Sequence, residues 1–245
     1  MFISCFTLVI KPLYNKVMYR RRRVVFLILM AIGLFAGIFY YQKEIPEPVD
    51  IGQTETTVSV ETPSSSQAIE MLQKLSIKGR APKTGYSRSQ FGNGWVIKEG
   101  CDTRNTILAR DLIDVKIDED CKVDSGTLND PYTGTVIKFV RGSKSSADVQ
   151  IDHVVALSNA WQTGAQQLSE ADRISLANDP LNLLAVSGPE NQIKSDGDSA
   201  TWLPKYKPFR CQYVTRQIQI KHRYNLWVTS TEKETMLTVL QKCAG

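Results

Sequence analysis

The sequence contains little histidine and little cysteine. Its 245 residues include two histidines, His153 and His222, and five cysteines, none of them in a Cys-x-x-Cys pair. Structural zinc sites are built from four cysteine or histidine ligands, often closely spaced in pairs. The chain is therefore not expected to fold around zinc, and it also shows no internal repeat.

Acidic residues are missing from the N-terminal part of the chain. Seven of the 30 lysines and arginines precede Glu44, the first acidic residue, so the other 23 are offset by all 25 acidic residues. The net charge of +5 therefore reflects the N-terminus. Nucleic-acid binding would have to depend on a local basic patch.

Long apolar runs are also missing, with one exception. Residues 24–41 carry no charge and follow Arg20–Arg23, and such a run is long enough to cross a bilayer. We expect a single-pass signal anchor, with residues 1–23 as a basic cytoplasmic N-terminus. A cleaved signal peptide is the alternative, but its apolar middle usually spans about 7–15 residues and ends at a small-x-small site. In either case the rest of the chain is exported, held outside the cell at the membrane or secreted.

Residues 42–67 have the composition of a disordered linker. This segment contains Pro46, Pro48 and Pro63, many threonines and serines, and five acidic residues after Lys43. Such a composition buries too little apolar surface to form a core. The folded domain is therefore expected to span residues 68–245.

The four cysteines of the exported region indicate disulfides. Cys101, Cys121, Cys211 and Cys243 are an even number in an oxidising compartment, whereas Cys5 precedes the apolar run. Sequence proximity favours Cys101–Cys121 and Cys211–Cys243 over the other two pairings.

Apolar periodicity predicts a mixture of helices and strands after residue 68. We expect helices from Ala68 and over 105–115, and a turn over Asn129–Gly134. Pro189 after Ser187 and Gly188 marks the start of another helix. The expected strands are short: 135–140, 149–151 followed directly by Asp152 and His153, and 182–186.

The order of these segments resembles an HNH nuclease. A strand ends in Asp152-His153, a second strand carries Asn182, and a helix carries Asn191 and Lys194. The nine-residue step between the two asparagines resembles the HNH domain of RNA-guided CRISPR nucleases. Residues 86–243 further resemble a secreted HNH family related to the C-terminal domain of GmrSD restriction enzymes. The segments that carry this second resemblance are Asp152–Leu157, Ala160–Trp161, Ala177–Leu183 and Trp202–Pro204, together with the four cysteines. It implies an α+β fold with a ββα-metal core, helical elaborations and two disulfides.

The chemistry of phosphodiester hydrolysis accounts for these residue types. His153 can accept a proton from water near neutral pH, and Asp152 and Asn191 offer oxygen ligands to a metal. Two protein ligands suit Mg²⁺, or Mn²⁺, because Mg²⁺ keeps much of its water. Asn182 is expected to hold the two strands together through hydrogen bonds, and Lys194 to contact the phosphate.

A local basic patch is present near the C-terminus. Its cations alternate with Tyr206, Phe209 and Tyr213 and include no acid, which favours contact with a nucleic-acid backbone. A solvated helix face is the alternative. The cations are Lys205, Lys207, Arg210, Arg216, Lys221 and Arg223.

Together these patterns predict a monomeric, metal-dependent endonuclease that acts outside the cytoplasm with low sequence specificity. They favour DNA over RNA because nothing in the sequence calls for a 2′-hydroxyl nucleophile. The alternative is a non-catalytic nucleic-acid-binding surface module that retains a nuclease fold. For Arg88 and Arg104, which lie in segments similar to the family motifs, only structural hydrogen bonds are expected.

Overall fold

The computed structural model describes most of the exported region. The described residues are 30, 32–34, 63–142 and 146–243. The chain divides into two units, Met1–Ser59 and Val60–Gly245, and the elements named below belong to the second unit.

Most of the predicted N-terminal organisation lies outside these residues. This applies to the basic N-terminus at 1–23, to the anchor at 24–41 except Met30 and 32–34, and to 42–62 of the linker. Within the described part of the chain, no helix has the length and apolar character needed to cross a membrane.

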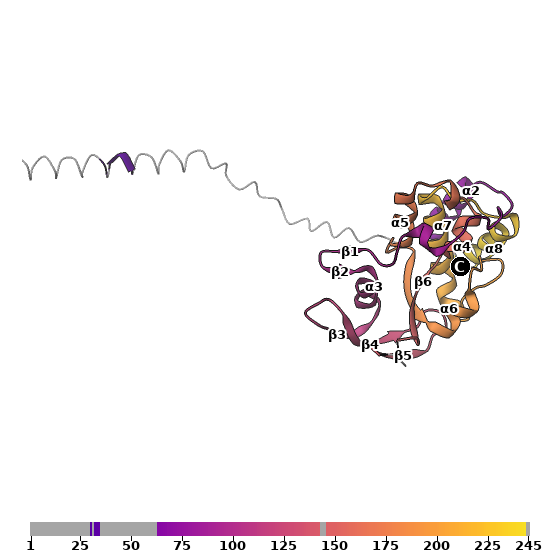
Figure 1. Ribbon diagram of the computed structural model, residues 1–245. Coiled ribbons are helices and arrows are strands. Elements are labelled where there is room, and N and C mark those ends of the chain that lie inside the picture. Colours follow the sequence, from indigo (N-terminus) through magenta and orange to yellow (C-terminus); the bar gives the residue numbers. More distant parts are fainter. Residues whose placement is uncertain (1–29, 31, 35–62, 143–145, 244–245) are drawn as a thin grey trace, which may run out of the picture. The chain divides into compact units, whose positions relative to one another are not determined.

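The second unit is a mixed α+β domain, which confirms the predicted class (Figure 1). Its sheets are small and antiparallel, with the strand orders β1-β2, β3-β4-β5 and β6-β7. The strands are β1 Ile97–Lys98, β2 Cys101–Asp102, β3 Ile113–Ile117, β4 Val123–Asn129, β5 Val136–Val140, β6 Val149–His153 and β7 Leu183–Ser187. The α-helices are α2 Ser65–Lys74, α3 Thr103–Asp111, α4 Leu157–Gln162, α5 Glu170–Ala177, α6 Gly188–Lys194, α7 Arg210–Arg223 and α8 Ser230–Gln241. The described residues also form the 3₁₀ turns η1 Arg88–Phe91, η2 Ala165–Gln167 and η3 Lys207–Phe209.

The ribbon of β6 and β7 lies between two hydrophobic cores. Side chains alternate between the faces of a strand, so Leu184 and Val186 face one core while Leu183 and Ala185 face the other. His153 pairs with Leu183 at one end of the ribbon. Burial of both faces fixes the register of the ribbon, and with it the position of the Asp152-His153 pair.

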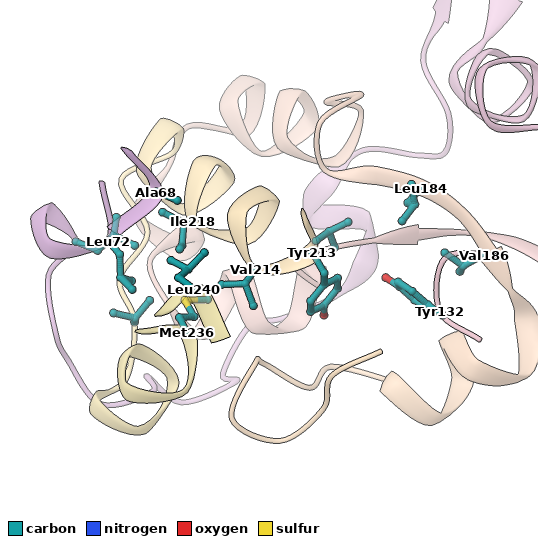
Figure 2. Packing of buried hydrophobic residues seen from close by; sticks show 13 residues of the cluster. Ala68, Leu72, Tyr132, Leu184, Val186, Tyr213, Val214, Ile218, Met236 and Leu240 are labelled. Carbon is teal, nitrogen blue, oxygen red and sulfur yellow. The ribbon is translucent and has the colours of Figure 1, made fainter. Parts of the chain in front are cut away.

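The first core is helical. Figure 2 shows Ala68 and Leu72 of α2 packed with Ile218 of α7 and with Met236 and Leu240 of α8. The helix α2 begins at Ser65, three residues before the expected start of the domain. Residues 65–67 of the expected linker therefore form the first turn of this helix, and its first core residue is Ala68.

The second core packs α3 and the sheet β3-β4-β5 against the other face of the ribbon. The prediction of one helix over 105–115 is wrong at its C-terminal end, because α3 stops at Asp111 and β3 begins at Ile113. The helix-like apolar spacing continues to Val115. From Ile113 on, however, the backbone pairs with β4, beginning at Thr127, and does not continue the helix.

Both predicted disulfides are present. Cys101 on β2 is bonded to Cys121 in the β3–β4 turn, and Cys211 in α7 is bonded to Cys243 after α8, with Cα–Cα distances of 5.3 and 5.9 Å. Each bond joins segments that are also neighbours in the fold.

The helix α6 follows β7 directly. The Ser187 side chain caps it by accepting from the Glu190 amide, and Pro189 occupies its first turn, as the sequence predicts. β6 and β7 pair with each other across the intervening α4, η2 and α5, and α6 follows β7, so the strand, strand and helix expected for the site occur in that order.

Candidate active-site cleft

A cleft of about 540 Å³ opens beside the end of β6. Its lining comes from η1, β6, the start of α4 and α6, and it includes three of the predicted site residues, Asp152, His153 and Asn191. Asn182 and Lys194 lie behind this surface, since both are buried and neither lines the cleft.

The His153 imidazole is held in one tautomer. Its Nε2 atom lies 2.9 Å from the Ala177 carbonyl oxygen, and because that oxygen can only accept, Nε2 must carry the proton. Burial lowers the pKa of His153 to about 3, and the charges of Arg88 and Lys194 act in the same direction. The ring is therefore neutral, and Nδ1 is left as a proton acceptor.

Trp95 packs against the same imidazole. The two rings are stacked at an interplanar angle of 11°, with their centroids 5.8 Å apart. This contact and the bond to Ala177 fix the ring from two sides.

Asp152 is held by two donors inside the domain. Its Oδ1 atom accepts from Lys194 Nζ at 3.0 Å, and its Oδ2 atom accepts from the Tyr132 hydroxyl. Burial raises the pKa of Asp152, while Lys194 and Tyr132 oppose that shift. Each carboxylate oxygen has a second lone pair, and Asp152 reaches the cleft.

The prediction that Lys194 contacts the phosphate needs correction. Its ammonium group is fully buried and donates to Asp152 and, at 2.9 Å, to the backbone oxygen of His153. Burying an unpaired ammonium group would be costly, so the pairing with Asp152 explains why this lysine points inward. Lys194 positions the cleft residues and does not face the cleft.

The two asparagines occupy different environments. Asn191 is partly exposed; its amide nitrogen donates to Gln150, and its amide oxygen has no hydrogen-bond partner among the described residues. Asn182 is fully buried, and its side chain accepts from the Val155 amide at 2.8 Å and donates to the Leu176 carbonyl at 3.2 Å. These side-chain to backbone hydrogen bonds join Asn182 to the segment after β6 and to α5, rather than to the two strands themselves.

The oxygen atoms at the cleft fit a weakly held divalent metal. Asp152 and Asn191 contribute a carboxylate and an amide oxygen to one cavity. Within the described residues, no cluster of three or more His, Cys, Asp or Glu side chains could hold a metal ion. An ion at Asp152 and Asn191 would therefore keep most of its ligands as water or substrate oxygens, which suits Mg²⁺.

Two cations line the cleft that the basic-patch prediction did not include. Lys83 forms an ion pair with Asp196 at 2.5 Å. Arg88 on η1 is exposed and makes no hydrogen bond or ion pair with any described residue. Arg88 is thus free to bind an anion, and the prediction of a purely structural role for it is not supported.

Sequence reasoning also missed Tyr132 and Trp95. Tyr132 lies in the predicted turn between β4 and β5, where Gly134 donates to the Asp130 carbonyl, yet its side chain is buried and reaches Asp152. The similarity to the family motifs was the only signal at Arg88. Neither Trp95 nor Tyr132 carried a comparable signal, because both act through contacts with distant segments.

The predicted basic patch is not a continuous surface. Lys221 is wholly buried, so its prediction as a nucleic-acid contact is wrong; its ammonium group is paired with Glu232 between α7 and α8. None of the six cations lines the cleft. The other five differ in environment: Lys205 and Arg223 pair with Glu190 and Asp179, Arg210 and Arg216 donate to backbone oxygens, and Lys207 is exposed.

Comparisons with known proteins show the family to which the domain is related. The family model of GmrSD restriction endonucleases, C-terminal domain, matches residues 102–239, more than half of the chain. A protein of Arthroderma benhamiae named "Uncharacterized secreted protein" is 38% identical over 183 residues, which cover 74% of this chain and 87% of that protein. No solved structure matches the chain.

Proposed function

The chain belongs to the family of GmrSD restriction endonuclease C-terminal domains, and from that membership we propose that it is a metal-dependent endonuclease. In this proposal β6, β7 and α6 form a ββα-metal core that hydrolyses nucleic-acid phosphodiester bonds. The substrate is DNA rather than RNA, and it is cut with low sequence specificity.

One observation carries the proposal. Asp152, His153 and Asn191 line a single cleft, and the hydrogen bond from His153 to the Ala177 carbonyl leaves an unprotonated ring nitrogen. A general base and two oxygen ligands are the groups that metal-assisted hydrolysis of a phosphodiester requires.

The residues around the cleft have separate tasks in this mechanism. His153 accepts the proton of the attacking water at Nδ1, while Ala177 and Trp95 keep its ring in place. Lys194 and Tyr132 hold the Asp152 carboxylate. A divalent ion bound by Asp152 and Asn191 would neutralise charge on the phosphate and the leaving oxygen.

Arg88 supplies the remaining charge. Its exposed guanidinium lies at the cleft without an acidic partner among the described residues, and a guanidinium matches the geometry of two phosphate oxygens. We assign Arg88 to the phosphate, in place of the buried Lys194.

The site of action is outside the cytoplasm. The two disulfides fit an oxidising compartment, and the Arthroderma benhamiae relative carries the word "secreted" in its name. The predicted anchor at 24–41 would keep the domain at the membrane, and its cleavage would release it.

The test is a plasmid-cleavage assay with the purified full chain. We expect nicked and linear DNA with Mg²⁺ or Mn²⁺ and intact plasmid with EDTA. His153→Ala should lower the rate at least about 100-fold if the imidazole is the general base. His222→Ala is the matched control because His222 is exposed and does not line the cleft. Binding of the plasmid without any cleavage would favour the non-catalytic binding module instead.

The metal ligands have a separate test. Asp152→Ala and Asn191→Ala should raise the Mn²⁺ concentration needed for half-maximal rate, whereas Ile193→Ala, an exposed neighbour on α6, should not. Calorimetry that finds the same Mn²⁺ affinity in both ligand variants and in the parent chain would place the metal elsewhere.

A further inference from the structure

A second, smaller cavity adjoins the cleft. It measures about 140 Å³ and shares Arg88, His153 and Leu157 with the larger one. Its other walls include Phe91, Gly94 and Trp95. The two cavities therefore meet at the proposed general base and at the proposed phosphate contact.

The shape and chemistry of this cavity suit one planar ring. Trp95 presents a partly exposed aromatic face, and Phe91 and Leu157 add buried apolar surface. Gly94 has a φ of +120°, and an added Cβ would meet no atom within 4 Å, so the wall is open at that point. Polar side chains are confined to Arg88 and His153, at the side shared with the cleft.

We propose that this cavity binds an unpaired nucleobase next to the scissile phosphate. The inference rests on the proposed function and narrows it to a substrate class, strands whose bases are unpaired. Arg88 lies on both cavities, so a phosphate held by its guanidinium would have the cleft on one side and the base cavity on the other.

Base pairing and this binding mode exclude each other. A base in a duplex is stacked and paired, so it must leave the helix before it can enter a side cavity, and that step costs unstacking and unpairing energy. An unpaired strand avoids that cost, and aromatic side chains stack on its bases with little regard to sequence. The same cavity therefore agrees with the expected low sequence specificity.

The first experiment varies the substrate and leaves the protein unchanged. The full chain with Mn²⁺ is given a short DNA with one cleavable phosphodiester, as a single strand, as a duplex, and as single strands with an abasic site on either side of that bond. We expect the single strand to be cut faster than the duplex. An abasic site on one side should raise KM at least about fivefold, in line with the loss of one stacked base.

Some outcomes would overturn the inference and leave the nuclease assignment intact. Equal kcat/KM for the intact strand and both abasic strands would show that no flanking base is bound. If the duplex is cut faster than the single strand, the base cavity is not used. If no substrate is cut, including plasmid, the nuclease proposal fails, and the binding measurement described next decides the base cavity alone.

The second experiment measures binding without cleavage. In EDTA, oligothymidylate should quench the tryptophan fluorescence of the full chain, and an abasic strand of equal length should not. Trp95→Phe should abolish most of the quench, because Trp161 and Trp227 are buried and Trp202 packs against Tyr132 and Tyr213. This variant keeps a ring beside His153, so it should fold, which thermal unfolding would check. A quench that persists in Trp95→Phe, or that the abasic strand reproduces, would overturn the proposal.

Discussion

Two lysines of this domain are buried in the same way and differ in what surrounds them. Lys194 is paired with Asp152 at 3.0 Å, and Lys221 with Glu232 at 3.0 Å; both ammonium groups are fully buried and each also donates to a backbone carbonyl. Asp152 lines the cleft. Glu232 instead caps α8, where its side chain accepts from the Thr229 amide.

The comparison shows that a buried lysine–carboxylate pair can either position a group at a cleft or hold helices together. Burial raises the pKa of both carboxyl groups, and the paired lysine opposes that shift in each case. The Glu232 carboxylate is enclosed between the helices α7 and α8. The Asp152 carboxylate is presented to a cavity that also contains His153 and Asn191. The pairs should therefore respond differently when each lysine is removed.

Lys221→Met should have the largest effect on stability. It leaves the Glu232 carboxylate buried without a cation, and breaking a buried pair in this way costs about 3–5 kcal/mol. Denaturant unfolding would measure the loss. Activity per folded molecule should not change, because α8 does not line the cleft. The double variant Lys221→Met/Glu232→Leu should recover much of the lost stability. If Lys221→Met alone is as stable as the parent chain, the buried pair does not stabilise the domain.

Lys194→Met should cost less stability and more activity. Asp152 can reach the water of the cleft when its cation is lost, so the expected cost is about 1–3 kcal/mol. The pKa of Asp152 should rise, since Lys194 holds it down. More Mn²⁺ should then be needed for half-maximal rate. An unchanged metal requirement would mean that the two pairs are equivalent.

Acidification should separate the two regions, because His153 lies beside only one of the pairs. Its pKa is about 3 in the folded chain, below its ordinary value of 6.5. The unfolded chain therefore binds the extra proton between these values, and stability falls as the pH drops below 6.5. The slope for this group is at most about 1.4 kcal/mol per pH unit. His153→Gln should reduce this dependence of stability on pH, whereas His222→Ala should not. An equal loss of stability below pH 6.5 in the parent chain and in both variants would refute the lowered pKa of His153.

Breaking an exposed ion pair should have the smallest effect on stability. Arg223 and Asp179 lie 2.7 Å apart, but the arginine side chain is 52% exposed, and Asp179 also accepts from the Tyr224 hydroxyl. Arg223→Ala should therefore change stability by less than about 1 kcal/mol. A loss as large as that of Lys221→Met would remove the distinction between surface and buried pairs.

The sequence was most informative where residues act through their order along the chain. The Asp152-His153 end of β6, Asn182 before β7 and Asn191 on α6 follow one another in this order along the chain. The resemblance of that order to an HNH nuclease was what grouped them. The disulfides followed from proximity in sequence. The fold class was implied by the resemblance to the HNH family and agreed with the mixture of helices and short strands that apolar periodicity predicts.

Residues that act across the fold were not predictable in this way. The partner of Lys221 lies on another helix, and within a basic stretch a buried lysine has the same sequence pattern as a solvated one. Tyr132 lies in a turn and reaches Asp152, and Trp95 reaches His153 from a segment between η1 and β1. Only tertiary packing reveals such contacts, and the same holds for the switch from helix to strand after Asp111.

The last helix of the domain also determines when the domain can complete its folding. Met236 and Leu240 of α8 complete the core around α2 and α7, and Cys243 supplies the second half of a disulfide. A growing chain on the ribosome lacks these groups until α8 and Cys243 have been synthesised, although domains can begin to fold during synthesis. The helices that support one face of the β6–β7 ribbon therefore form a complete core only after α8, the last helix of the domain, has been made.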